Sequence, residues 1–315
     1  MNKRRAFIIG IKSTKLSKKE KKFLNKYKPW GVILFTRNIK NIEQASNLTF
    51  SIRKIFQDKK YPILIDQEGG RVNRLENIIS FDNLSSEFFG NRYLKRFKEF
   101  QFFYKLFVDK TSYLLKLIGI NINTVPVLDL RYKGSSNIIG DRSFSKNPKI
   151  VSKIGDYCIQ YFHQNGIGTV IKHIPGHGLA KVDSHNFTPI VKRKQSYLLK
   201  NDFITFKKKK SFFAMTAHII FDDIDKKNTA THSHRLIKLI RNKIGFKNIL
   251  ISDDLSMKSL KGSLKINTIK TFKAGCNLAL HCNGNLKEME VVGKNSPIIN
   301  KFITKKTSQF YKILS

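Results

Sequence analysis

The chain has 315 residues, of which 41% are hydrophobic and 26% charged, so it can bury one sizeable core. No run approaches the roughly 20 apolar residues that span a bilayer, and the short apolar run after Arg5 reaches Lys12 too soon for a secretion signal. We therefore expect a globular protein without membrane insertion. The three cysteines lack the spacing of a zinc or redox site, which favours a reduced, cytoplasmic location.

The formal net charge of +38 invites a nucleic-acid or membrane-surface interpretation. The lysines are nevertheless spread from end to end, in a chain rich in Ile, Asn and Phe, a bias that AT-rich coding can produce by itself. The dense clusters at 18–22 and 207–210 lie beside helix-like segments and are typical of solvated helix faces. We expect no specific nucleic-acid binding, and any complex with duplex DNA should be weak and strongly salt-dependent.

Eight short apolar runs along the chain are typical of buried strands. They are residues 7–10, 32–35, 63–66, 122–125, 169–173, 213–217, 249–252 and 278–281. Most are separated by lysine-rich stretches with helical spacing of apolar residues, at 16–28, 42–58, 91–119, 150–165 and 233–243. This alternation predicts an α/β fold, a single (β/α)8 barrel of the TIM type, formed by one catalytic domain over residues 1–315. A doubly wound open sheet is the alternative.

Polar clusters follow five of the predicted strands, at the points where a barrel builds its active site. These clusters are 66–74, 126–129, the histidine-rich loop 172–185, His218 and 253–254. Because the carboxyl ends of all the strands meet at one face of a barrel, we expect a single active site there.

In chain order these segments read IDQEGGRVNRL, PVLD, IGDRSF, KHIPGHG, DSH, AH and SDDLSM. They resemble the bacterial β-N-acetylhexosaminidases of glycoside hydrolase family 3, over about residues 31–283. The pattern is most similar to the single-domain cytoplasmic enzymes of peptidoglycan recycling. The resemblance implies an enzyme that removes terminal GlcNAc from muropeptides. One departure is that Ser-Lys-Asn-Pro stands at 145–148, where the family often has Gly-Arg-Asp-Pro, so we expect the contacts of this loop to differ from the family's.

A retaining glycosidase needs a carboxylate beneath the anomeric carbon and an acid beside the leaving oxygen. Asp253 or Asp254 must supply the carboxylate, and only one of these successive residues can face the barrel axis. The resemblance aligns the nucleophile with Asp253 and leaves Asp254 structural. The alternative is that the pair merely caps a helix beginning near Leu255.

The resemblance implies that the acid is a histidine rather than a second carboxyl group. Asp183 and His185 stand two residues apart in a loop, close enough for the carboxylate to accept a hydrogen bond from one imidazole nitrogen while the other faces the substrate. Such an aspartate fixes the tautomer and raises the pKa of the imidazole. In isolation the tripeptide could be no more than a turn.

Sugar hydroxyls need charged or polar partners in a buried site. The resemblance carries this role to Asp66, Arg74, Arg142, Lys172 and His173. Glu68 and Arg71 could equally be ion-paired scaffolding, and His177 is expected to order the Pro-Gly turn at 175–176. Because Pro and Gly oppose the helix that would place His173 and His177 on one face, we expect no metal ion, and the predicted chemistry needs no cofactor.

The sequence therefore predicts a retaining exo-β-N-acetylglucosaminidase that acts, as a monomer, on anhydro-muropeptides in cell-wall recycling. One alternative is a β-N-acetylglucosaminide phosphorylase, because a neutral histidine base repels phosphate less than a carboxylate does. Another is a basic polyanion-binding protein with an inactive barrel, against which the intact Asp253, Asp183 and His185 argue. The region after Asn283 is weakly patterned and has no predicted role.

Overall fold

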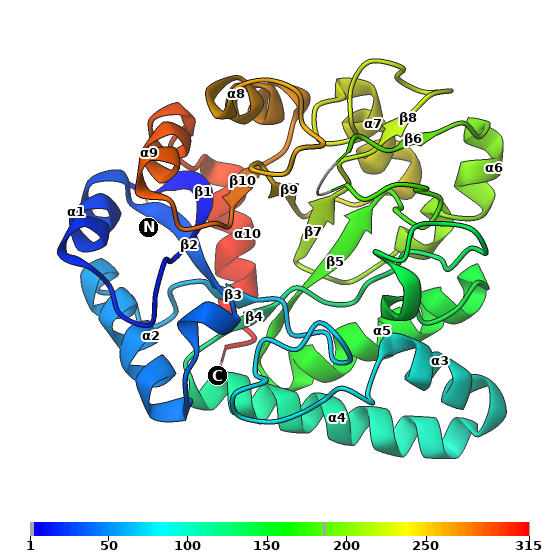
Figure 1. Ribbon diagram of the computed structural model, residues 1–315, viewed down its shortest axis with the longest axis horizontal. Helices are drawn as coiled ribbons and strands as arrows, with labels where there is room; N and C mark the ends of the chain where they lie inside the picture. Colours follow the sequence, from blue (N-terminus) through cyan, green and yellow to red (C-terminus); the bar gives the residue numbers. More distant parts are fainter. Residues whose placement is uncertain (1–2, 185–186, 315) are drawn as a thin grey trace.

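The computed structural model of the protein describes residues 3–184 and 187–314. Eight parallel strands close into a barrel in the order β1-β2-β3-β4-β5-β7-β9-β10 (Figure 1). Their bounds are β1 Arg5–Gly10, β2 Pro29–Leu34, β3 Ile63–Ile65, β4 Ile122–Asn123, β5 Gly168–Ile174, β7 Phe213–Thr216, β9 Ile249–Asp254 and β10 Leu278–His281. Ile8 of β1 pairs with Gly31 on one side and Leu280 on the other. The predicted barrel is therefore confirmed, and the open sheet is wrong.

Helices surround the barrel, and a separate two-stranded sheet joins β6 (Ile190–Val191) to β8 (Ile220–Phe221) (Figure 1). The helices are α1 Lys18–Tyr27, α2 Ile42–Phe56, α3 Ser86–Lys95, α4 Phe97–Leu117, α5 Pro148–Gln164, α6 Gln195–Lys200, α7 His234–Leu239, α8 Leu264–Ala274, α9 Leu286–Asn295 and α10 Lys301–Tyr311. In the described part of the chain, none of these helices combines the length and apolar character needed to cross a membrane.

Local sequence signals explain where several helices begin and end. Ser17 caps α1 by accepting from the backbone N–H of Glu20, whose carboxylate accepts from the Ser17 N–H at 2.8 Å. α5 begins at Pro148, directly after the capping residue Asn147. The single helix expected over 91–119 is instead two helices, because Arg96 leaves the helical conformation with φ −147° and ψ 70°. Both helices bury apolar residues in the same core, so the apolar spacing continues through the break.

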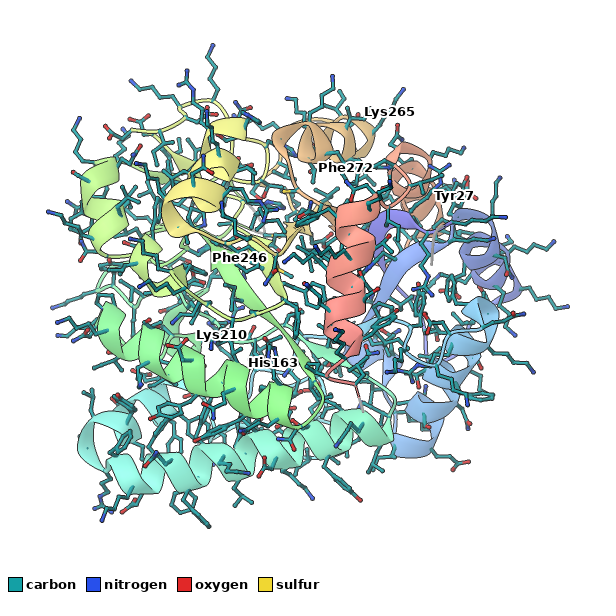
Figure 2. All side chains as sticks on the ribbon, turned by 180° about the vertical axis from the view of Figure 1, so that it is seen from behind. Tyr27, His163, Lys210, Phe246, Lys265 and Phe272 are labelled. Atoms are coloured by element: carbon teal, nitrogen blue, oxygen red, sulfur yellow. The ribbon has the colours of Figure 1, made fainter. Side chains whose placement is uncertain are left out.

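The C-terminal region closes the barrel at the starts of the strands. Figure 2 shows α10 from behind, running across the middle of the molecule. Phe310 is fully buried, and a Cβ added to Gly168, the first residue of β5, would lie 2.6 Å from its ring. The Trp30 indole N–H donates to the Thr307 hydroxyl at 2.9 Å. The region without a predicted role thus seals one end of the barrel and leaves the other end for a site.

Candidate active site

A cavity of about 340 Å³ lies at the carboxyl ends of the barrel strands. Seven of the eight predicted site residues line it: Asp66, Arg74, Arg142, Lys172, His173, Asp183 and Asp253. The eighth, His185, lies outside the described residues. The predicted residues therefore come together from four strands or their following loops, β3, β4, β5 and β9, as expected for a barrel active site.

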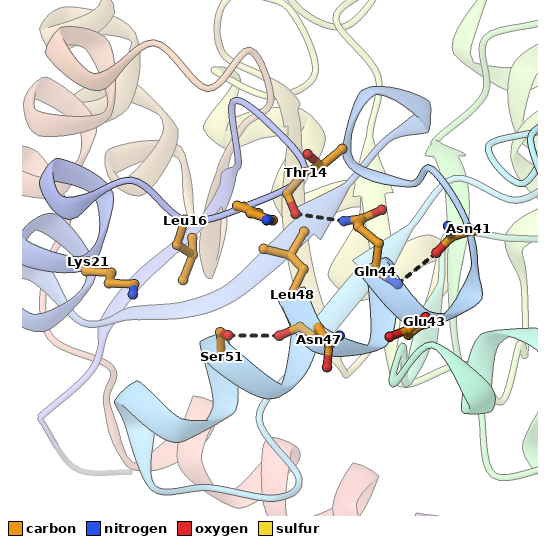
Figure 3. A pocket seen from close by; sticks show the side chains of 10 residues that line it. Thr14, Leu16, Lys21, Asn41, Glu43, Gln44, Asn47, Leu48 and Ser51 are labelled. Carbon is orange, nitrogen blue, oxygen red and sulfur yellow. Dashed lines mark hydrogen bonds between the residues drawn. The ribbon is translucent and has the colours of Figure 1, made fainter.

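A larger cleft of about 460 Å³ lies elsewhere, between the loop before α1 and helix α2 (Figure 3). The Gln44 side-chain amide spans part of it and donates to the Thr14 carbonyl at 2.7 Å. Asp183 and Asp253, the predicted catalytic residues that the structure describes, do not border this cleft. Size alone does not identify the active site here, and the chemistry of the smaller cavity does.

Lys172, at the end of β5, sits between two carboxylates on the loop after β3. Its ammonium group lies 2.9 Å from Asp66 Oδ1 and 2.6 Å from Glu68 Oε1, and it also donates to the Thr124 hydroxyl at 3.0 Å. The Arg142 guanidinium donates two hydrogen bonds of 2.8 Å to the two oxygens of Glu68. Glu68 therefore holds both Lys172 and Arg142 in place. Its role is the ion-paired scaffolding that the sequence left open for it.

These ion pairs keep the buried carboxylates ionised. Burial by itself would raise the pKa of Asp66, but the positive charges of Lys172 and Arg74 outweigh it and lower that pKa. Burial opposes ionisation of Glu68 in the same way, and Arg142 and Lys172 lower its pKa strongly. The floor of the cavity is thus a fixed array of charges that can bond to sugar hydroxyls without reorganising.

Asp129, which follows β4 in the chain, orders the histidine loop and was not predicted as a site residue. Its Oδ2 lies 2.7 Å from Nδ1 of His173, so this nitrogen donates to the carboxylate and Nε2 is left for the cavity. The same carboxylate accepts the backbone N–H of His177 at 2.6 Å. The sequence feature that could have identified Asp129 as a site residue is its place at the end of PVLD, directly after a predicted strand.

His177 connects the histidine loop to the loop that carries the predicted dyad. Its Nε2 lies 3.0 Å from the Ser184 hydroxyl, next in the chain to Asp183. Burial is the main factor that lowers the pKa of His177, to about 4, so its ring is neutral near pH 7. The ring thus contacts the dyad loop, and the expectation that it orders the turn at 175–176 stays a prediction. Among the described residues, no group of three or more His, Cys, Asp or Glu side chains is arranged to hold a metal ion.

The two aspartates at the end of β9 have different surroundings. The Asp254 carboxylate accepts hydrogen bonds from the N–H groups of Ser256 and Cys282, at 3.0 and 3.2 Å, and from the Ser256 hydroxyl at 2.7 Å. Both residues line the cavity, and Asp253 Oδ1 accepts the N–H of Asp254 at 2.8 Å. The alternative that the pair caps a helix near Leu255 is wrong, because turns follow β9 and the next helix, α8, is capped by Ser263.

Asp202 packs beneath the histidine loop and is expected to make stability depend on pH. Asp202 is buried, and the Tyr132 hydroxyl donates to its carboxylate at 2.9 Å. A Cβ added to Gly176 would lie 3.0 Å from the Cβ of Asp202, so the two residues are in close contact. Burial raises the pKa of its carboxyl to about 7. Between the unfolded pKa of about 4 and this value, the native state binds more protons, so the free energy of unfolding should fall as pH rises.

We expect Asp202→Asn to remove this dependence, since the amide oxygen can still accept from Tyr132. Between pH 4 and pH 8, the wild type should lose up to about 4 kcal/mol more unfolding free energy than the variant. Urea unfolding at a series of pH values measures it. Parallel pH profiles for the two proteins would contradict the prediction.

Comparison with known proteins identifies the family of the chain. Residues 6–309 match the family model for the glycosyl hydrolase family 3 N-terminal domain. The chain belongs to glycosyl hydrolase family 3. A beta-hexosaminidase of Haemophilus influenzae is 33% identical over 286 residues, which cover 88% of this chain and 79% of that protein. A beta-hexosaminidase of Thioalkalivibrio sulfidiphilus is 30% identical over 282 residues, covering 88% and 80%.

The fold is also that of a solved family member. The structure of NagZ from Neisseria gonorrhoeae in complex with N-trifluoroacetyl-D-glucosamine superposes with a TM-score of 0.87 at 28% identity, covering 98% of this chain and 90% of NagZ. The predicted family and enzyme class are therefore confirmed: the chain is a glycoside hydrolase of the β-hexosaminidase type.

Proposed function

We propose that this family 3 hydrolase is a retaining exo-β-N-acetylglucosaminidase that forms a covalent glycosyl-aspartate at Asp253. The observation that carries the proposal is the cavity itself, where Asp253 at the end of β9 faces the ion-paired groups of β3 and β5. The NagZ relative was solved with an N-acylated glucosamine, which supports an N-acetylated sugar as the substrate here.

The charge of the cavity supports glycoside chemistry. Among the described residues, 19 line the cavity, and these include five of the 22 acidic residues of the chain, although the protein carries a net charge of +38. These five are Asp66, Glu68, Asp183, Asp253 and Asp254. The transition state of glycoside cleavage resembles an oxocarbenium cation, which concentrated carboxylates stabilise. Four cations, Arg71, Arg74, Arg142 and Lys172, share the lining, so its charge does not separate water from phosphate as the final acceptor. We propose water, and the phosphate assay described below distinguishes the two.

In the proposed reaction, Asp66, Arg74, Arg142, Lys172 and His173 bind the terminal sugar and orient it. His185, aligned by Asp183, protonates the leaving oxygen while Asp253 attacks the anomeric carbon, with retention after the second step. His185 then takes a proton from the water that releases the sugar from Asp253. Asp129 holds His173 in one tautomer throughout, with Nδ1 as the donor.

We further propose that the substrates are anhydro-muropeptides of cell-wall recycling and that residues 1–315 act as one catalytic domain and a monomer in the cytoplasm. The resemblance of the seven motifs supports the substrate. All three cysteines are free thiols, which fits a reducing compartment.

The experiment that tests the function is hydrolysis of a chromogenic β-GlcNAc glycoside with and without inorganic phosphate, with the sugar product separated by chromatography. We expect free GlcNAc at a rate independent of phosphate. A phosphate-dependent rate with a sugar phosphate as product would establish the phosphorylase. No turnover, together with tight binding to a polyanion, would favour the inactive barrel.

Selectivity for the N-acetyl sugar should be strong. We expect kcat/KM for aryl β-GlcNAc to exceed that for aryl β-glucoside by at least about 100-fold, because buried polar groups arranged for the N-acetyl sugar are left unpaired by glucose. Steady-state kinetics with the two glycosides and the same phenol measure this ratio. Similar specificity constants would contradict the proposed substrate.

A further inference from the structure

Helix α4 carries a stripe of exposed apolar side chains on the face turned away from the core. Phe102, Leu106, Tyr113 and Leu117 are 66%, 54%, 56% and 40% exposed. They occupy positions i, i+4, i+11 and i+15, which lie within about 60° of one another on a helix and run for about 22 Å along it. The opposite face of α4 is buried in the core. In Figure 1, α4 follows the lower edge of the molecule.

The apolar surface continues beside the stripe toward α3. A groove of about 340 Å³ is lined there by Phe81, Leu84, Phe88, Phe89, Phe103, Leu106 and Phe107, with Arg92 and Lys110 at its border. Leu94 of α3 is 60% exposed as well. Contiguous apolar surface of this kind marks a binding face more often than isolated exposed residues do.

Lysines border the stripe on both edges. At 100° per residue, Lys98, Lys105 and Lys116 follow one edge and Lys110 the other. Asp109 lies between the stripe and the edge with Lys98 and Lys116, and its carboxylate is bound by Lys105 at 2.5 Å and by the Asn165 amide at 2.8 Å. Glu99 lies on the arc of the stripe and is ion-paired with Arg92 and Arg96. Apolar side chains flanked by long cationic ones match the boundary between headgroups and acyl chains of an anionic membrane.

The charge of the protein decides between possible occupants. A second copy of the chain would bring the same charge of +38 to the interface, and this repulsion opposes a symmetric dimer through α4. An anionic lipid surface is attracted by the same field. Contact there would involve side chains only, consistent with the lack of a membrane-crossing helix among the described residues.

We propose that the face formed by the α4 stripe and the adjoining α3 groove is a peripheral docking surface for anionic lipid bilayers. α4 lies in the outer ring of helices and contacts α2, α3 and α5. The active-site cavity opens at the carboxyl ends of the strands instead, so a docked molecule keeps that cavity open to substrate.

Co-sedimentation with vesicles tests the proposal, using phosphatidylcholine alone or mixed with phosphatidylglycerol. Wild type should bind the mixed vesicles and not the neutral ones. Phe102→Ser with Leu106→Ser should weaken this binding by about tenfold or more, and Tyr113→Ser with Leu117→Ser should do so independently. The matched control is Ile266→Ser with Phe302→Ser, which removes exposed apolar groups from α8 and α10 and should change binding by no more than about twofold.

None of these substitutions alters charge or touches the active-site cavity, so hydrolysis of the soluble chromogenic glycoside should be unchanged and serves as the test of folding. Equal binding by stripe and control variants would show that charge alone attracts the protein and would overturn the proposal. Absence of binding to mixed vesicles would do the same. Concentration-dependent dimerisation that the stripe variants abolish, without vesicle binding, would assign the face to a second copy instead.

Discussion

Asp253→Ala is expected to lower kcat for β-GlcNAc hydrolysis by a factor on the order of 10⁴ while the protein stays folded. The reason is that this side chain would provide both the covalent intermediate and the negative charge beneath the anomeric carbon. Its position at the end of β9, on the wall of the cavity, places it in the strand-end layer that carries catalytic groups in barrels. Steady-state kinetics and circular dichroism measure the two effects.

Asp254→Ala is the matched control, because it removes the same group one residue away. Asp254 holds the turn after β9 through Ser256 and Cys282, so its loss should reduce stability by about 1–3 kcal/mol and reduce activity much less. If Asp253→Ala kept more than a small percentage of activity while Asp254→Ala was inactive, the assignment of the nucleophile would be wrong.

His185→Ala should separate substrates by their leaving groups. For substrates with poor leaving groups, such as muropeptides, loss of the proton donor should cost about 10²–10⁴-fold in kcat/KM. Activated aryl glycosides should lose much less in the first step, because the phenolate departs without protonation. Hydrolysis of the glycosyl-enzyme would still lack its base, so phenol release should show a rapid burst followed by a slow steady state.

Asp183→Ala should show a milder form of the same behaviour, since the imidazole is present but poorly oriented. A leaving-group series of aryl glycosides, measured for wild type and both variants, gives the comparison. An equal loss on every substrate with no burst would mean that His185 is not the acid/base. The hydrogen bond between His177 and Ser184 joins the described part of this loop, up to Ser184, to the histidine loop beside the cavity.

The barrel could be predicted from the sequence because its signals are local. Buried parallel strands read as continuous apolar runs, as in 249–252, and each is followed by a helix with its own spacing and caps. The helix beginning near Leu255 is absent from the part of the chain that the structure describes. The Asp254 carboxylate instead binds Ser256 in a turn and accepts the N–H of Cys282, which follows the neighbouring strand β10. A contact between residues 28 apart in the chain leaves no periodic signal.

Motifs and strand positions predicted the site residues. They did not predict the ion pairs and hydrogen bonds that hold those residues in place. The Glu68 pairs with Arg142 and Lys172 span 74 and 104 residues of chain, and the contact of Asp129 with His173 spans 44. Such pairings depend on which loops the closed barrel brings together. The packing of α10 beneath the barrel was missed for a similar reason, since Thr307 meets Trp30 across 277 residues.

The central claim is that Asp253 carries the sugar during catalysis, and the most direct test is to locate the covalent intermediate. His185→Ala, mixed with an activated aryl β-GlcNAc glycoside and quenched after the burst, should gain the mass of one N-acetylhexosaminyl group. Digestion and peptide mass analysis should place that group on the peptide containing Asp253, and the adduct should be absent when Asp253→Ala is added. A sugar attached to any other residue, or turnover through the burst without an adduct, would contradict the account.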